Sequence, residues 1–194
     1  EIMQACGAQG HCLGLDMTIG CLGALSALDM AQGWLNTHGG GVAAIVTAER
    51  WSYTVDHGSV PSMGLWAHGD GASAAVVAAG TSHPAKAIFR GAEFTTQSEL
   101  NGLVLVKYGG TRHPMAPEGA HPGERLFMGT SRADIRERYA YGYSSSLEAM
   151  KKRFDVTPER VIINQTSALF LQLIAQVIGI PIERKPSAPV PSPM

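Results

Sequence analysis

Apolar runs of strand length alternate along this chain with segments of helical periodicity, and this alternation limits the fold class more than any other feature. Strands are predicted in the runs at 12–17, 42–49, 85–94, 100–108 and 160–165, and after a Gly-rich turn within 68–80. The run at 42–49, VAAIVTAE, is almost entirely apolar, which predicts a parallel-type strand covered on both faces. Strands alternating with helices favour α/β layers.

Helical spacing of apolar residues predicts helices at 22–36, 132–154 and 167–179. The first ends at the stretch THGGG, and the second has many charges opposite an apolar face, as a surface helix does. The third is almost wholly apolar, with Ser167 as cap and Gly179 as stop, and is expected in the middle of a layered fold. A long loop is predicted at 109–129, and the Pro-rich end at 185–194 is predicted to be an extended linker.

Charge and cysteine content exclude several function classes. The 194 residues hold 15 Lys and Arg against 16 Asp and Glu, without the basic clusters that bind nucleic acid or a membrane surface. No apolar run reaches membrane-spanning length and no secretion signal opens the sequence, so a cytoplasmic location is expected. Cys6, Cys12 and Cys21 are too few for a disulfide framework and lack the spacing of a zinc site, so no metal is expected.

Cys21 lies between the predicted strand at 12–17 and the predicted helix at 22–36. The unpaired N–H groups and dipole at a helix start favour a thiolate, and they can also stabilise an oxyanion. A single cysteine beside Leu and Ala is, however, more often an inert small apolar residue. The residues alone leave both interpretations of Cys21 open, while Cys6 and Cys12 are interpreted as structural.

Three motifs occur in order: LDMTIGCLGALSALDMA at 15–31, VAAIVTAE at 42–49 and HGDGASAAVV at 68–77. Together they resemble the active-site region of the ketoacyl-acyl carrier protein synthase III group in the thiolase superfamily. The resemblance implies a thiolase-like layered α/β/α/β/α fold, incomplete in this chain. It also implies that Cys21 accepts an acyl group from a thioester, and that His68 and Gly69 lie near the acyl pocket as substrate-binding residues.

The segment at 161–184 resembles the strand and helix that carry His-Gln-Ala-Asn in this family. This chain has Asn164, Gln165, Thr166 and Ser167 there, so Asn164 replaces the catalytic histidine and Ser167 takes the last, substrate-binding position. An Asn amide can donate a hydrogen bond to a thioester oxygen, but it cannot exchange a proton near neutral pH. Condensation is therefore expected to be impaired more than acyl transfer.

The resemblance corresponds to the middle portion of the family's chain, which implies a fragment, a processed product or one half of a split protein. Residues 1–82 are expected to end the N-terminal thiolase-like half, and residues 83–184 to begin the C-terminal half. Tyr53 stands where some members carry an Arg that contacts coenzyme A, which leaves the acyl donor open.

Two functions follow from the resemblance. The first is an acyltransferase or ketoacyl synthase III-like enzyme that forms an acyl-thioester on Cys21 and transfers the acyl group to a carbon, oxygen or nitrogen acceptor, in fatty-acid-like or polyketide metabolism. It would use an acyl-coenzyme A or acyl carrier protein thioester as substrate and bind no cofactor. The second is a non-catalytic or supporting subunit of a heteromeric condensing enzyme. Either function implies a homo- or heterodimer with a thiolase-fold chain.

Three histidines, His68, His113 and His121, are considered as a base that could replace the family histidine missing at position 164.

Overall fold

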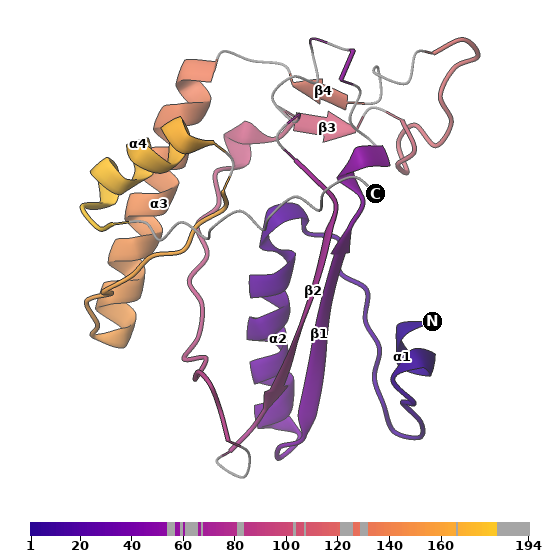
Figure 1. Cartoon of the computed structure of the whole chain (residues 1–194), viewed down its shortest axis with the longest axis vertical. Helices are drawn as coiled ribbons and strands as arrows, with labels where there is room; N and C mark the ends of the chain where they lie inside the picture. Colours follow the sequence, from indigo (N-terminus) through magenta and orange to yellow (C-terminus); the bar gives the residue numbers. More distant parts are fainter. Residues whose placement is uncertain are drawn as a thin grey trace, which may run out of the picture. The chain divides into compact units, whose positions relative to one another are not determined.

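The structure, a computed structural model, describes residues 1–53, 57–58, 60, 66, 68–80, 84–102, 104–106, 108–120, 126–128, 132–165 and 167–181. The chain forms two compact units, one from Glu1–Thr47 with Ser73–Gly91 and the other from Ala48–Ala72 with Ala92–Met194. The predicted linker at 185–194 lies outside the described residues. Figure 1 labels the helices and strands of both units.

The elements that begin in the first unit are α1 (Ile2–Ala5), η1 (Gly20–Leu22), α2 (Gly23–Thr37) and β1 (Val42–Glu49). The predicted helix at 22–36 is confirmed in α2, and the predicted strand at 42–49 is confirmed with the same bounds in β1. Between them Gly39, Gly40 and Gly41 have φ angles of 74°, 119° and 111°. Side chains other than glycine rarely adopt this backbone, which explains why THGGG ends the helix.

Strand β1 pairs with β2 (Gly71–Ala78), and the pairing is antiparallel, not parallel. At one end Ala79 N–H donates to the Gly41 carbonyl at 3.3 Å, and at the other the hydroxyls of Thr47 and Ser73 lie 2.7 Å apart. Coverage also differs from the prediction, since Ile45 is 9% exposed while its neighbour Val46 is 42% exposed. One face of β1 is therefore the better covered, as in the antiparallel sheets that face solvent on one side.

Three predicted strands are wrong. The runs at 12–17 and 85–94 have no regular secondary structure, and the run at 160–165 has only an isolated bridge residue at Val161. An apolar run becomes a strand only where a neighbouring strand takes its backbone hydrogen bonds. Within the described part of the chain, the two sheets contain only β1 with β2 and β3 with β4.

The second unit contains η2 (Trp51–Tyr53), η4 (Ser98–Leu100), β3 (Val104–Val106), β4 (Leu126–Met128), α3 (Arg132–Phe154) and α4 (Ala168–Ile178). Strands β3 and β4 are antiparallel, with Leu105 opposite Phe127. The strand predicted at 100–108 is thus confirmed only over its centre. The prediction of a loop over the whole of 109–129 is wrong at its end, since Leu126–Met128 form β4 and pair with β3.

Helices α3 and α4 pack against each other and form the core of the second unit (Figure 1). Both predicted helices are confirmed, α3 with the predicted bounds. Ile174 is 0% exposed on α4, and the Phe170 ring meets the Tyr139 and Tyr143 rings edge-on at 5.7 and 6.1 Å. Leu169 on the same helix is 73% exposed, so the expectation that α4 is covered all round is wrong for the described part of this chain.

Residues 92–97 run along α3 as an extended segment that continues into η4, and side chains hold both in place. Its partners on the helix, Arg138, Ser146 and Arg153, lie on one face, because they recur at intervals of eight and seven positions, about two helical turns each. The contacts are Arg153 to the Ala92 carbonyl and Glu93 (2.9 and 2.7 Å), Thr95 to Ser146 (2.7 Å), Gln97 to the Arg138 carbonyl (2.8 Å), and the Arg138–Glu99 ion pair. None of the described helices is long and apolar enough to cross a membrane.

Replacing Ile174 with Ala should lower the free energy of unfolding of the second unit by about 2–5 kcal/mol, because the change leaves a cavity between α3 and α4. Leu169→Ala on the exposed face of α4 is the matched control and should change it by less than about 0.5 kcal/mol. Urea unfolding followed by circular dichroism measures both. Equal effects of the two variants would contradict the packing described above.

Candidate active site

Cys21 lies in the 3₁₀ turn η1, immediately before α2 begins at Gly23. The turn is closed by the Leu22 N–H, which donates to the Ile19 carbonyl at 3.1 Å. Gly20 has a φ of 37°, and a side chain at this position would meet no other atom within 4 Å. The Cys21 side chain is exposed, so the predicted nucleophile lies at a helix start where a substrate can reach it.

The start of α2 carries no side chain that would neutralise its dipole. No side chain caps the helix, and no acidic residue lies in its first turn. The Gly23 N–H donates to the Gly20 carbonyl of the 3₁₀ turn. The other backbone N–H groups of a first helical turn have no partner within the helix and carry a partial positive charge, which can stabilise an oxyanion.

The predicted substrate residues His68 and Gly69 lie in the turn that leads into β2. The His68 ring is half-buried and lies 5.2 Å from the Trp51 ring, at an interplanar angle of 45°. Asp70 in the same turn accepts two hydrogen bonds from Ser52, one from its backbone N–H at 2.7 Å and one from its hydroxyl at 2.5 Å. Gly69 is exposed, and a side chain there would meet nothing within 4 Å.

The sequence interpretation missed Trp51, Ser52 and Asp70. The aspartate had a sequence signal, because Asp beside Gly often binds local backbone N–H groups in turns. Its partner could not be found that way, since Ser52 lies eighteen positions earlier. Hydrogen bonds from the Ser52 hydroxyl and backbone, and then the charge of Arg50, hold the pKa of the Asp70 carboxyl below its ordinary value of 3.8.

Asn164 and Ser167 lie on the irregular segment that leads into α4. Asn164 is exposed. Ser167 is the helix N-cap, and its hydroxyl accepts a hydrogen bond from the Phe170 N–H at 3.2 Å, which confirms its predicted role as a cap. The C-terminal end of the same helix has a shallow hollow lined by Ala175, Gln176, Gly179, Ile180 and Pro181, which includes none of the predicted site residues.

The structure places the predicted site residues in two groups. Cys21 belongs to the first compact unit, whereas His68, Gly69, Asn164 and Ser167 belong to the second. Among the described residues, no group of three or more His, Cys, Asp or Glu side chains could hold a metal ion.

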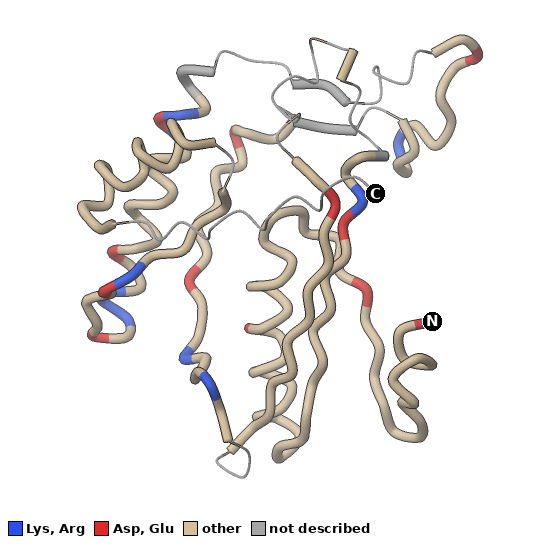
Figure 2. Tube along the Cα trace, in the orientation of Figure 1, with Lys and Arg blue, Asp and Glu red and all other residues tan. Residues whose placement is uncertain are grey.

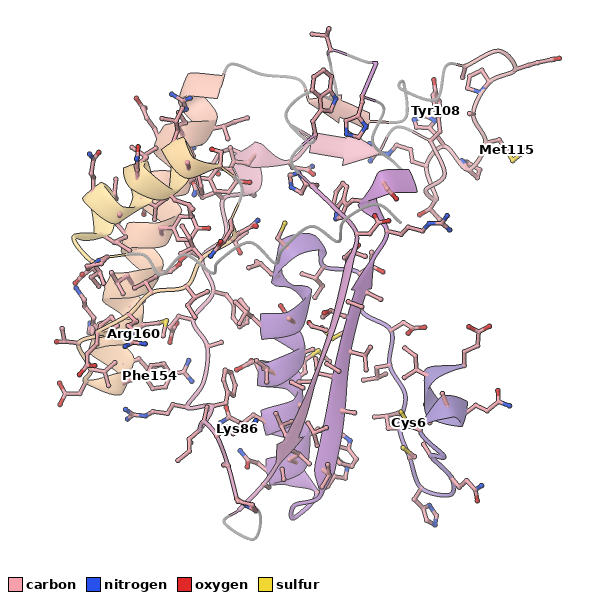
Figure 3. The ribbon with its side chains drawn as sticks, viewed as in Figure 1. Cys6, Lys86, Tyr108, Met115, Phe154 and Arg160 are labelled. Carbon is pink, nitrogen blue, oxygen red and sulfur yellow. The ribbon has the colours of Figure 1, made fainter. Side chains whose placement is uncertain are left out.

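The other histidines and cysteines considered from the sequence lie as follows. The His113 ring meets the Tyr108 ring edge-on at 6.4 Å, and the His113 carbonyl accepts a hydrogen bond from the Gly109 N–H at 2.8 Å. His113 therefore belongs to the turn between Tyr108 and Met115, which are labelled in Figure 3. His121 lies outside the described residues. Cys6, labelled in the same figure beside α1, is exposed, as is Cys12.

The Asp70–Ser52 contact should make stability depend on pH in a defined direction. A carboxyl whose pKa is lowered by folding stabilises the protein above its unfolded-state pKa, and this stabilisation is lost as the pH falls through the folded-state value. Wild type should therefore exceed Asp70→Asn in stability near pH 7 and lose that advantage as the pH falls below 3.8. Urea unfolding at several pH values measures this, with Asp16→Asn as the exposed control. A difference that does not change with pH would contradict the assignment.

Comparison with known proteins finds one family model that matches part of this chain. Residues 15–97 match the family model described as 3-oxoacyl-[acyl-carrier-protein (ACP)] synthase III. No curated protein matches the chain. The matched range includes Cys21, β1, the turn with Asp70, and β2.

The solved structures with a similar fold are also described as 3-oxoacyl-(acyl-carrier-protein) synthases. The chain is similar to a 3-oxoacyl-(acyl-carrier-protein) synthase III solved at 2.1 Å, with a TM-score of 0.77 and 19% identity over 93% of this chain and 56% of that one. It is also similar to the 3-oxoacyl-(acyl-carrier protein) synthase of Burkholderia xenovorans LB400, with a TM-score of 0.73 and 18% identity over 95% of this chain and 53% of that one. The synthase III of Pseudomonas aeruginosa PAO1 gives a TM-score of 0.62 and 16% identity over 84% of this chain and 49% of that one.

The chain thus spans about half the length of the solved structures that it matches. Both comparisons agree with the resemblance that the three sequence motifs predicted. Residues 15–97 therefore carry the sequence pattern of the 3-oxoacyl-acyl carrier protein synthase III family, and the chain has the thiolase-like α/β fold of those enzymes.

Proposed function

We propose that this chain forms an acyl-enzyme on Cys21 and passes the acyl group to an acceptor, as part of a ketoacyl synthase III-like acyltransferase. The observation that carries the proposal is the exposed thiol at the uncapped start of α2, within the segment that matches the family. An exposed thiol near unpaired backbone N–H groups is the environment in which cysteine nucleophiles are activated. The substrate would be an acyl-coenzyme A or acyl carrier protein thioester, with no bound cofactor.

Acyl transfer at Cys21 would proceed in two steps. The Cys21 thiolate, after losing its proton to solvent, attacks the thioester carbonyl, and the backbone N–H groups at the helix start stabilise the oxyanion. A carbon–sulfur bond to Cys21 forms as the bond to the donor sulfur breaks, and the departing thiolate takes a proton from water. An oxygen or nitrogen acceptor, which gives up its proton to solvent, or a carbanion formed when a malonyl thioester loses carbon dioxide, then attacks the acyl-enzyme carbonyl. The bond from the acyl carbon to the acceptor forms as its bond to the Cys21 sulfur breaks, and the Cys21 thiolate is released.

Asn164 would orient the thioester carbonyl as a hydrogen-bond donor. Its amide can donate to an oxygen but cannot act as a general acid or base near neutral pH. Residues 161–181 contain no Lys, Arg, Asp or Glu, and Figure 2 draws α4 in tan, without blue or red, along its whole length. A neutral surface near Asn164 suits an uncharged acyl group. In this proposal His68, Gly69 and Ser167 contribute to binding it.

The alternative is a supporting subunit of a condensing enzyme, which a partner thiolase-fold chain would complete. Two observations favour it. Asn164 stands in place of the family's histidine, and apolar side chains are left exposed on both units, among them Val76 at 74% and Leu169 at 73%. The division into thiolase-like halves at residue 82, a dimeric assembly, a cytoplasmic location and a role in fatty-acid-like or polyketide metabolism remain parts of the proposal.

Incubation of the purified protein with acyl-coenzyme A and acyl carrier protein thioesters should add one acyl mass, measured on the intact protein. Cys21→Ala should abolish the gain because it removes the nucleophile, whereas Cys12→Ala, another exposed cysteine, should keep it. A gain that survives Cys21→Ala would place the nucleophile elsewhere. No gain from any donor, in folded protein with any copurifying partner, would favour the supporting subunit.

Replacing Asn164 with His should raise decarboxylative condensation with a malonyl thioester by about 10²-fold or more, because the imidazole supplies a general acid or base. The rate of acyl loading on Cys21 should change much less. Product formation from a preformed acyl-enzyme measures the first rate, and single-turnover mass spectrometry measures the second. Asn101→His, on a turn after η4, is the control. An unchanged condensation rate would refute the role assigned to position 164.

A further inference from the structure

The Asp70 carboxylate fixes the two ends of the connection between β1 and β2 to each other. Its two oxygens bind one residue, Ser52, at the backbone N–H and at the hydroxyl, 2.7 and 2.5 Å away. Hydrogen bonds with an ionised partner are short and roughly twice as strong as neutral ones. A carboxylate bound in this two-point manner sets both the distance and the orientation of the backbone at Ser52.

The aromatic rings of Trp51 and His68 pack together next to the Asp70–Ser52 hydrogen bonds. Trp51 directly precedes Ser52, and His68 lies two positions before Asp70. Their ring centroids are 5.2 Å apart with an interplanar angle of 45°, and both side chains are half-buried. Aromatic rings at this separation attract each other in tilted arrangements. The hydrogen bonds to Ser52 thus hold the two backbone segments at a spacing that the ring pair requires.

Gly69 and Gly71, on either side of Asp70, do not by themselves fix the conformation of the turn. A side chain added at Gly69 or Gly71 would meet no atom within 4 Å, and neither glycine has a positive φ. The turn is therefore not held by close packing around its glycines among the described residues. The carboxylate of Asp70 directly contacts the opposite end of the connection through two hydrogen bonds from Ser52.

We propose that Asp70 is a positioning residue, which holds the His68 imidazole in a defined place through Ser52 and the Trp51 ring. The inference rests on the proposed function where it gives His68 a part in acyl binding. The geometry of the Asp70–Ser52 contact and of the ring pair does not depend on that function. The consequence for the reaction is that Asp70 acts on acyl loading only through His68.

The first test is a magnetic resonance measurement that needs no activity. In the full chain, the Trp51 ring should shift the ring-proton resonances of His68 away from those of a free histidine, and His68→Gln identifies these resonances by their loss. Asp70→Ala should move them toward the free position. Ser52→Ala, which loses the hydroxyl hydrogen bond but keeps the backbone one, should move them partway. This milder variant keeps the test usable if Asp70→Ala does not fold. Asp16→Ala is the exposed control and should leave them in place. Unmoved resonances in Asp70→Ala with wild-type circular dichroism would overturn the proposal.

The second test is a double-mutant cycle on acyl loading of Cys21. Asp70→Ala should slow loading about tenfold, because a displaced binding group weakens orientation of the substrate. In a His68→Ala background the same substitution should have no further effect, since residues that act through one another are not additive. Additive losses would show that Asp70 acts independently of His68 and would refute the proposal.

The two tests separate this inference from the proposed function. Wild type that does not load Cys21 with any donor would refute the function, and the His68 resonances would still decide the role of Asp70. Wild type that loads normally, with Asp70→Ala as fast as wild type, would refute the positioning role and leave the function standing.

Discussion

Extended backbone needs a neighbour to take its hydrogen bonds, and the organisation of this chain follows from where it finds one. β1 finds β2 through the contacts between Gly41 and Ala79 and between Thr47 and Ser73. In the segment at 92–97 the Ala92 carbonyl accepts from Arg153 of α3, and the side chains of Thr95 and Gln97 bind the same helix. Unpaired backbone is costly only when water is excluded from it, so irregular segments persist where they are exposed. The candidate site depends on this frame, because the turn with His68 and Asp70 enters β2, and Cys21 leads into the helix that precedes β1.

The proposed nucleophile Cys21 and the proposed orienting residue Asn164 each lie just before the start of a helix. The thiol of Cys21 precedes a helix that has no capping side chain, whereas Ser167 caps α4 with its hydroxyl. At the start of α2 the backbone itself takes up N–H groups, because Leu22 donates to the Ile19 carbonyl and Gly23 to the Gly20 carbonyl of the 3₁₀ turn. At the start of α4 a side chain does so, since the Ser167 hydroxyl accepts from the Phe170 N–H. The proposed roles of Cys21 and Asn164 thus lie at two helix starts that are completed in different ways.

The sequence was a good guide to the helices, to β1 and to the strand predicted within 68–80, which is β2, since periodicity, caps and glycine stops are local properties. It predicted the start of α4 at Ser167 and its end at Gly179 correctly. It failed at 12–17, 85–94 and 160–165, because whether an apolar run becomes a strand depends on distant partners. For the site, the sequence placed Cys21 at a helix start but could not reveal the contact between Asp70 and Ser52, because these residues lie eighteen positions apart along the chain. The catalytic and binding roles of Cys21, Asn164, His68, Gly69 and Ser167 stay predictions.

The extended segment beside α3 is matched to the helix in length. From Ala92 to Glu99 the segment, which is extended as far as Gln97 and then enters η4, reaches roughly 20 Å, and from Arg138 to Arg153 a helix rises roughly 22 Å. Contacts at both ends, Arg153 with Glu93 and Arg138 with Glu99, are possible together only because these two lengths agree. Deleting one residue from the segment would shorten it by about 3.3 Å, which two residues of helix would offset only while rotating the binding face by about 200°. Length changes in the two segments therefore cannot compensate each other, and this pair of elements tolerates substitutions more readily than insertions or deletions.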